Sequence, residues 1–250
     1  MRVASKVCAF TGHRPNKLPW RYDETASGCV ALKAVLAEQI GLLAEAGVTQ
    51  FLSGMAEGVD TWAALSVLEL REKNPAIKLH CILPCTSQAE KWSASSRDRY
   101  RSILELADSI VYVSRDNHKN CMLDRNRFLV KYADYVLAVY NGERRGGTAA
   151  TVRYAQKLGR EIILIDPVTL SISNGETATS PARSRQTRNA MDIPRADVRE
   201  GAATGRDKSH AEGVFDWTRE RPVRGLGDTQ QAHRNSQKDI PMPCLPTSSE

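Results

Sequence analysis

Two short glycine-bearing segments of this chain carry the residue types best suited to holding a phosphate group. Residues 53–60 read SGMAEGVD and lie between an apolar run that ends at Leu52 and an apparent helix. Residues 146–148 read GGT and again lie between an apolar run and a helical pattern. A glycine turn at a helix start leaves backbone N–H groups unpaired at the positive end of the helix dipole, which suits an anion. Both segments therefore predict contacts with a nucleotide or another phosphorylated ligand.

The segment that follows the first apolar run, residues 11–15, reads TGHRP. Arg14 offers a planar fork suited to phosphate or carboxylate. His13 could donate or accept a proton, because the unperturbed pKa of histidine is about 6.5. The alternative is a structural loop in which Arg14 pairs with a carboxylate. For Asp60 two roles stay open, namely stabilising the first turn of a helix or binding a ribose hydroxyl.

A further segment, residues 121–126, reads CMLDRN and follows the fourth apolar run. We expect Asp124 to cap a helix here, so that Arg125 and Asn126 could face the same cleft. Trp92 could stack on a base, although packing at a helix start explains a tryptophan equally well. No Gly-Lys-Ser/Thr triplet occurs, and the glycine spacing differs from the dinucleotide fingerprint, so neither motif assigns the ligand.

Six apolar runs of strand length alternate with segments of helical periodicity. We expect strands at 7–10, 50–52, 78–83, 109–113, 135–140 and 161–165. We expect helices at 31–43, 61–73, 89–107, 124–132 and 148–158. This alternation predicts an α/β fold, a Rossmann-like, doubly wound and largely parallel sheet. Ligands of such sheets bind beyond the carboxyl ends of the strands, where every segment described above would lie.

The composition divides the chain into a folded domain and a tail. Val, Ile and Leu clusters recur up to about residue 173, whereas residues 174–250 are rich in Arg, Pro, Ser, Thr, Gly and Asp. The latter segment buries too little apolar surface to offset its ordering entropy, so we expect a single domain at 1–173 and a disordered tail at 174–250. The net charge of +6 fits an anionic ligand but is far below a dedicated nucleic-acid footprint.

The cysteines and the N-terminus indicate a soluble, cytoplasmic protein. The six cysteines show no metal-binding spacing, and Cys8 and Cys81 fall in apparent buried strands, so we expect reduced thiols and no metal. Residues 1–6 lack the apolar core of a signal peptide. No apolar run approaches the roughly 20 residues that cross a bilayer, so we expect no membrane partner. We assign no cofactor. The oligomeric state stays open, and a homo-oligomer is one of the alternatives.

Taken together, these segments resemble the YpsA-like family of the SLOG superfamily. The segments at 11–15, 53–60, 121–126 and 146–148 occur in that family's order, and Trp92 falls where the family usually has a tryptophan. The resemblance spans roughly residues 6 to 166. It implies a Rossmann-like fold with a pocket for nucleotides or nucleotide-derived ligands, whereas the biochemical activity of this branch is largely undefined.

Two relatives of that family imply different functions. The Lonely Guy phosphoribohydrolases carry a Pro-Gly-Gly-x-Gly-Thr-x-x-Glu pattern, whose Glu acts in cleaving a nucleoside monophosphate. When this pattern is aligned on residues 147–148, its Glu falls at Thr151, which argues against the same hydrolysis mechanism here. The DNA-processing protein DprA has a turn very similar to residues 53–60 and binds single-stranded DNA.

Our leading hypothesis is a module that binds or senses a nucleotide or a nucleotide-derived small molecule. The main alternative is an enzyme that cleaves an N-glycosidic bond, with Glu57 or Asp60 as the carboxylate and His13 assisting. Binding of single-stranded DNA is a third, less favoured hypothesis, because aromatic and basic residues are too little interleaved. We assign ligand contacts to Thr11, Gly12, Arg14, Ser53, Gly54, Met55, Gly58, Trp92, Arg125, Asn126, Gly146, Gly147 and Thr148.

Overall fold

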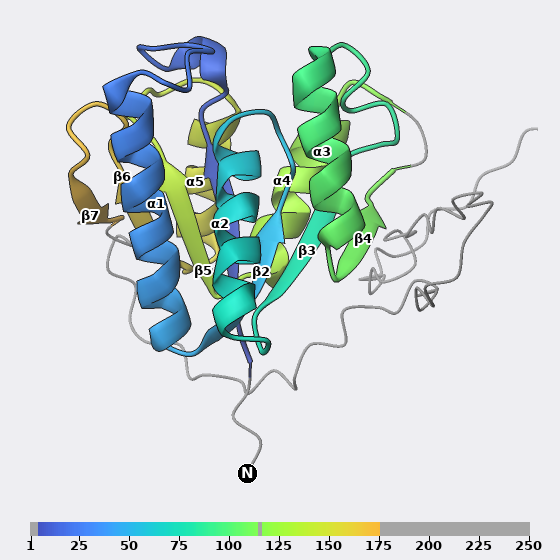
Figure 1. The fold of residues 1–250 in the computed structure, drawn as a ribbon. Coiled ribbons are helices and arrows are strands. Elements are labelled where there is room, and N and C mark those ends of the chain that lie inside the picture. Colours follow the sequence, from blue (N-terminus) through green and yellow to red (C-terminus); the bar gives the residue numbers. More distant parts are fainter. Residues whose placement is uncertain (1–4, 115–116, 176–250) are drawn as a thin grey trace, which may run out of the picture. The chain divides into compact units, whose positions relative to one another are not determined.

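A seven-stranded sheet forms the centre of the fold. The structure, a computed structural model, describes residues 5–114 and 117–175. The strands lie in the order β4-β3-β2-β1-β5-β6-β7 (Figure 1). Their bounds are β1 Lys6–Gly12, β2 Val48–Ser53, β3 Lys78–Leu83, β4 Ser109–Tyr112, β5 Tyr135–Val139, β6 Glu161–Ile165 and β7 Ile172–Asn174. Neighbouring strands are parallel except for β6 and β7, which pair antiparallel.

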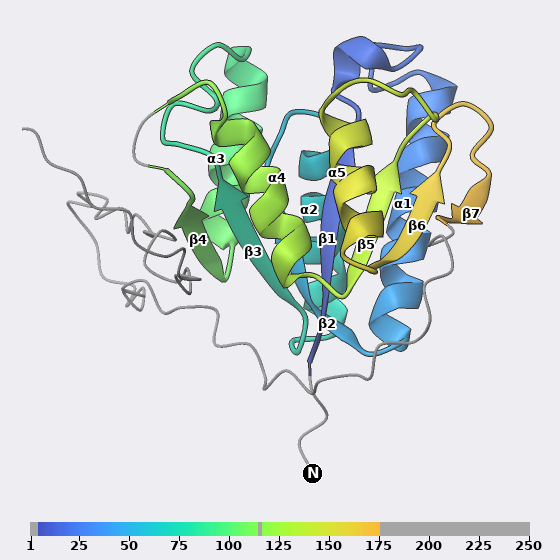
Figure 2. The ribbon, with the colours of Figure 1, turned by 180° about the vertical axis from the view of Figure 1, so that it is seen from behind.

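Helices cover both faces of this sheet (Figure 1, Figure 2). One face carries α1 (Ser27–Glu45), α2 (Val59–Lys73) and α3 (Ala94–Leu106), and the other carries α4 (Cys121–Tyr132) and α5 (Gly147–Lys157). Successive strand residues point to opposite faces, so the core has two parts. Phe10 and Phe51 stack in the part that contains α1 and α2, with ring centroids 5.8 Å apart, whereas Ala9 and Leu52 pack with α4 and α5. The predicted Rossmann-like α/β fold is confirmed.

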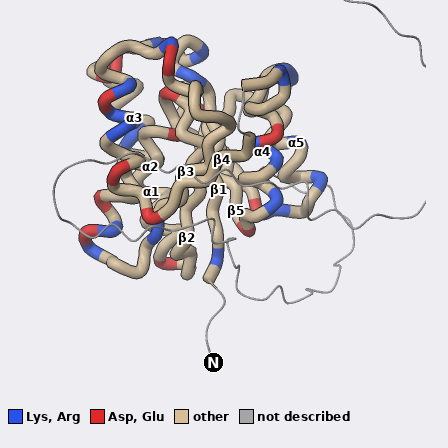
Figure 3. The backbone as a smooth tube through the Cα atoms, turned by 90° about the vertical axis from the view of Figure 1, so that its right-hand side faces the viewer, with Lys and Arg blue, Asp and Glu red and all other residues tan. Residues whose placement is uncertain are grey.

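Charged residues lie mainly on the helices and loops around the sheet. Along the described chain, Lys and Arg alternate with Asp and Glu rather than gathering in one large region (Figure 3). This distribution agrees with the modest net charge of the sequence. Where positive side chains do converge on one place, as described below, the concentration is local.

Helix α1 is longer and more apolar than the sequence pattern predicts. Of the described helices, it alone has the length and composition to cross a membrane, with a mean hydropathy of 1.4. Leu32, Leu36 and Ile40 on this helix are buried in the core beside the sheet. A helix packed in a protein core shows the same apolar character on its buried face, whereas Val30 and Leu42 on this helix are exposed.

Three helices start several residues away from the predicted position, and α1 begins at Ser27 instead of residue 31. α3 begins at Ala94 instead of about residue 89, because residues 86–91 form turns and Ser93 caps the helix, accepting a hydrogen bond from the Ser96 N–H at 3.2 Å. The prediction that Asp124 caps α4 is wrong. The helix starts at Cys121, so Asp124 lies within its first turn.

The C-terminal part of the described chain contains one strand that was not predicted. β7 has only three residues, all of them exposed, and it shows no apolar pattern. It is held by antiparallel pairing with β6. Nearly all of the predicted disordered tail, from residue 176 onwards, lies outside the described residues, so that prediction stays untested.

Candidate functional site

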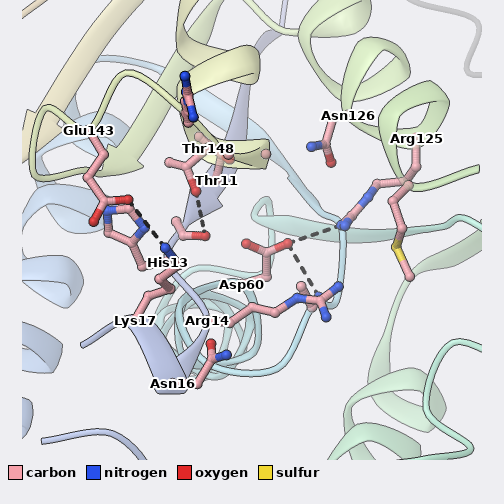
Figure 4. A pocket seen from close by; sticks show the side chains of 16 residues that line it. Thr11, His13, Arg14, Asn16, Lys17, Asp60, Arg125, Asn126, Glu143 and Thr148 are labelled. Carbon is pink, nitrogen blue, oxygen red and sulfur yellow. Dashed lines mark hydrogen bonds and ion pairs between the residues drawn. The ribbon is translucent and has the colours of Figure 1, made fainter. Parts of the chain in front are cut away.

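A pocket of about 290 Å³ lies at the carboxyl ends of β1 and β5 (Figure 4). β1 pairs with β2 on one side and with β5 on the other, so the order of the strands along the chain reverses here. Ligands of open α/β sheets bind in the crevice at such a switch point. The pocket is lined by Thr11, Gly12, His13, Arg14, Asn16, Lys17, Ala56, Asp60, Met122, Arg125, Asn126, Glu143, Arg145, Gly146, Gly147 and Thr148.

A buried ion pair forms one wall of the pocket. Nη1 of Arg125 lies 3.1 Å from Oδ2 of Asp60, and the two side chains are only 5% and 7% exposed. The same Oδ2 accepts the N–H of Ala56 at 3.3 Å. Burial raises the pKa of the Asp60 carboxyl, and the adjacent Arg125 guanidinium opposes this rise. The second carboxylate oxygen takes part in neither contact and faces the pocket (Figure 4).

The glycine segment before α2 holds this ion pair in position. A Cβ on Gly54 would lie 1.3 Å from Nη1 of Arg125, so only glycine leaves room for the guanidinium. Ser53 donates its hydroxyl to the carbonyl of Asp60 at 2.9 Å and accepts the N–H of Met55 at 3.1 Å. The segment therefore positions Asp60 and Arg125, although Ser53, Gly54 and Met55 do not themselves line the pocket.

The second glycine segment forms the opposite wall. Gly146 precedes α5 with a φ of +112°, a left-handed conformation that favours glycine. Thr148 donates its hydroxyl to the carbonyl of Gly12 at 3.0 Å, which ties the start of α5 to the end of β1. Asn126 on α4 donates its amide to the hydroxyl of Thr151 at 3.0 Å. These bonds bring the ends of β1, α4 and α5 together around one space.

Four cationic side chains line the pocket, and two of them have an anionic partner. Arg125 pairs with Asp60, and Nζ of Lys17 lies 3.5 Å from Oε2 of Glu143. The other two are Arg14 and Arg145, which are exposed. Within residues 5–114 and 117–175, neither of these forms an ion pair with a carboxylate. Arg14 extends along the pocket wall close to Asp60 (Figure 4).

His13 joins the loops that follow β1 and β5. Its Nε2 lies 2.9 Å from Oδ1 of Asn141. The Nδ2 of Asn141 in turn donates to Oε1 of Glu143 at 3.3 Å. The hydrogen bond from Asn141, together with the charge of Lys17, holds the pKa of Glu143 below its usual value. The pocket therefore has a polar rim in which a histidine, an amide and a carboxylate are connected.

Ten of the sixteen predicted site residues line the pocket, and six do not. Gly58, which precedes α2 with a φ of +96°, packs close to Pro15. Glu57 accepts the hydroxyl of Ser96 at 2.7 Å, which directs its carboxylate toward α3. Trp92 packs edge-to-face on Tyr100, with centroids 5.4 Å apart. The other three are Ser53, Gly54 and Met55, which hold the ion pair in position. Roles of these six in ligand binding stay predictions.

Six residues that line the pocket were not predicted. They are Asn16, Lys17, Ala56, Met122, Glu143 and Arg145. Arg145 directly precedes the second glycine segment, so its position beside that motif could have identified it. Lys17 ends a short 3₁₀ helix, Pro15–Lys17, that folds back toward the loop after β5. Among the described residues, no group of three or more His, Cys, Asp or Glu side chains could hold a metal ion.

A model described as the YspA SLOG family (YpsA) matches residues 8–170. The chain belongs to this family. All sixteen residues that line the pocket lie within the matched range. The resemblance carried by the four sequence segments is thereby confirmed.

Similar chains occur in several bacteria. UPF0398 proteins of Halalkalibacterium halodurans and Bacillus pumilus are 30% and 31% identical to this chain over 154 residues, which cover 61% and 60% of it and 81% and 82% of the relatives. A UPF0398 protein of Bacillus cereus is 30% identical over 157 residues, covering 62% of this chain and 84% of the relative.

One solved structure with a similar fold is that of DNA processing protein A from Helicobacter pylori. The work on that structure describes the single-stranded DNA binding mode of that protein. The overlap has a TM-score of 0.44 and 18% sequence identity. It covers 65% of this chain and 66% of that protein, so this chain spans just under two thirds of its length.

Proposed function

We propose that this SLOG-family protein binds a nucleotide, or a small molecule derived from one, in the pocket between β1 and β5. The observation that carries the proposal is the presence of two exposed cations, Arg14 and Arg145, that line the pocket and have no carboxylate partner in the described part of the chain. Unpaired positive charge beside a helix N-terminus favours an anionic ligand. The pocket volume of about 290 Å³ is near the lower end of the range for small-molecule sites.

We assign separate contacts to the phosphate and to the sugar of the ligand. Phosphate oxygens would accept hydrogen bonds from the backbone N–H groups at Gly147 and Thr148 and from the guanidinium of Arg14. A hydroxyl of the sugar would contact the second carboxylate oxygen of Asp60. Nε of Arg125 is buried and has no hydrogen-bond partner among the described residues. A buried donor of this kind is costly, and a shift of the guanidinium on binding would let a ligand oxygen satisfy it.

An N-glycosidase remains the second candidate, because the pocket contains two carboxylates and a histidine. Such a reaction needs a carboxylate to stabilise an oxocarbenium-like transition state and a proton donor. Glu57, one of the predicted catalytic carboxylates, is bonded to Ser96 instead of lining the pocket. The catalytic hypothesis therefore depends on Asp60 or Glu143, with His13 as the proton donor.

Binding of single-stranded DNA has less support than either candidate. The interspersed charges in Figure 3 differ from the continuous basic groove that tracks a nucleic-acid backbone. A cytoplasmic location and assembly into a homo-oligomer also stay proposals. Cell fractionation and light scattering of the full chain would test them directly.

The test of the proposed function is incubation of the full chain with a panel of nucleotides, followed by mass spectrometry of bound and released species. Gly147 offers a matched pair of variants, because a Cβ there would meet only the Asn126 side chain, at 3.9 Å. Gly147→Asp places a negative charge at the start of α5, and Gly147→Asn places an uncharged side chain of the same shape there. We expect Gly147→Asp to weaken nucleotide binding about tenfold or more relative to Gly147→Asn.

Each outcome distinguishes the candidates. Retention of an intact nucleotide that is weakened only by Gly147→Asp supports the binding function. Release of free base that disappears in Asp60→Asn or Glu143→Gln would establish the glycosidase instead. Binding of oligonucleotides alone, steeply weakened by salt, would favour the third hypothesis.

A further inference from the structure

The carboxylate of Glu143 lies inside the proposed ligand pocket, on the rim formed by the loop after β5. Figure 4 shows this side chain beside His13 and directed toward the ammonium group of Lys17. Oε2 lies 3.5 Å from Nζ of Lys17, and Oε1 accepts the amide of Asn141 at 3.3 Å. The side chain is 42% exposed, so a ligand in the pocket can reach it. A carboxylate of the protein itself therefore holds one of the four cations that line the pocket.

The pairing of charges leaves two positive side chains in the pocket without a carboxylate partner among the described residues. Asp60 pairs with Arg125, and Glu143 pairs with Lys17. The remaining cations, Arg14 and Arg145, have no carboxylate partner in the ranges that the structure describes. Two unpaired positive charges complement a ligand with about two negative charges, such as a single phosphate monoester.

We propose that Glu143 determines the charge of the ligand that this pocket accepts, by competing with ligand phosphates for Lys17. The inference rests on the proposed nucleotide-binding function. A monophosphate leaves the contact between Glu143 and Lys17 in place and uses the two unpaired arginines. A di- or triphosphate brings further negative charge close to Glu143, and it binds more weakly unless Lys17 is released to it.

The loop that carries Glu143 is built to hold this carboxylate in place. The N–H of Glu143 donates to Oδ1 of Asn141 at 3.2 Å, and the hydroxyl of Tyr140 donates to the carbonyl of Glu143. Asn141 is in turn bonded to His13, which follows β1. The backbone of Glu143 is therefore fixed within the loop after β5, and its carboxylate is held by the amide of Asn141 as well as by Lys17.

The test compares AMP, ADP and ATP, which gain negative charge with each phosphate. Dissociation constants are measured by isothermal titration calorimetry with EDTA present, for the full chain and for Glu143→Gln, which keeps the shape of the side chain and removes its charge. The control is Glu161→Gln, because Glu161 is an exposed residue at the start of β6, at the opposite end of the strands from the pocket. We expect Glu143→Gln to improve ATP binding about five- to tenfold and AMP binding about two- to threefold, with no change in the control.

A second pair of variants tests the competition for Lys17 directly. Lys17→Met should weaken ATP binding more in the Glu143→Gln background than in the original chain, because only there is the ammonium group free of Glu143. An unchanged ratio of ATP to AMP affinity in Glu143→Gln, or weaker binding of both, would overturn this inference while leaving the binding function intact. If none of the three nucleotides binds to either chain, the inference fails, and the wider nucleotide panel then decides whether the proposed function fails with it.

Discussion

Replacing Gly54 with alanine should disrupt the wall of the pocket. A Cβ at this position would lie 1.3 Å from Nη1 and 2.4 Å from Cζ of Arg125, and 2.9 Å from Oδ2 of Asp60. These separations are far inside normal contact distances, so the present arrangement of the three residues cannot persist in the variant. Either the guanidinium shifts away from its present position beside Asp60 or the turn after β2 moves, and both changes disturb the buried ion pair.

The size of the effect follows from the burial of that pair. Removing one partner from a buried ion pair costs about 3–5 kcal/mol, because an uncompensated charge is left in the interior. Arg125 has a long side chain and lines an open pocket, so its guanidinium can recover part of its hydration there. We therefore expect Gly54→Ala to lower the free energy of unfolding by about 3 kcal/mol, at the lower end of this range.

Urea unfolding followed by tryptophan fluorescence measures this change. Gly41→Ala is the matched control, because a Cβ on Gly41 in helix α1 would meet no atom within 4 Å. This control should gain about 0.5–1 kcal/mol from the higher helix propensity of alanine.

The double variant Gly54→Ala/Arg125→Ala tests the cause of the destabilisation. Without the guanidinium, the alanine at position 54 should cost less than about 1 kcal/mol beyond the cost of Arg125→Ala alone. Fully additive costs would refute the argument, and so would a Gly54→Ala chain within about 0.5 kcal/mol of the original in stability.

Two further predictions concern His80 and Trp92. Burial lowers the pKa of His80 from 6.5 to about 4, so the unfolded chain binds a proton between these values that the folded chain does not. The original chain should therefore lose about 3 kcal/mol of stability as pH falls through this window. In urea unfolding measured at a series of pH values, His80→Gln should show little of that loss. Parallel profiles of stability against pH for the two chains would contradict this. Trp92→Leu should cost about 1–2 kcal/mol through its lost contact with Tyr100 and leave nucleotide affinity within twofold, whereas a larger loss of affinity would restore the base-stacking role.

The sheet could be predicted where burial determines the strand. β3 and β6 have the predicted bounds residue for residue, because strands covered on both faces are mostly apolar, and four of the six residues of β3 and four of the five of β6 are apolar. β7 depends instead on a turn, in which the N–H of Asp166 donates to the carbonyl of Ser171 at 3.0 Å and so returns the chain beside β6. Its own residues are exposed, and no local pattern marks them as a strand.

The site could be predicted where the backbone matters and less well where side-chain direction matters. The glycine turn and the helix start at Gly147 follow from local sequence, and both adjoin the pocket. Glu57 lies in the same turn, but Met55 with a φ of +55° and Gly58 with a φ of +96° set a path that turns its carboxylate toward α3. Glu143 lies in a loop with no periodic pattern, so only the pairing of β5 with β1 reveals that it reaches the pocket.

Thr151 determines how far the comparison with the Lonely Guy hydrolases extends. It occupies the position of their catalytic glutamate when the second glycine segments are aligned. Thr151 is 3% exposed, donates its hydroxyl to the carbonyl of Gly147 at 2.9 Å and accepts the amide of Asn126 at 3.0 Å. It therefore joins α5 to α4 instead of presenting an oxygen to the pocket.

The carboxylates that do line the pocket, Asp60 and Glu143, each already form an ion pair with a cation. Both oxygens of Glu143 already have partners, so glycosidic cleavage would depend on the one oxygen of Asp60 that takes part in neither contact, whereas binding of a phosphate by the unpaired arginines depends on no carboxylate.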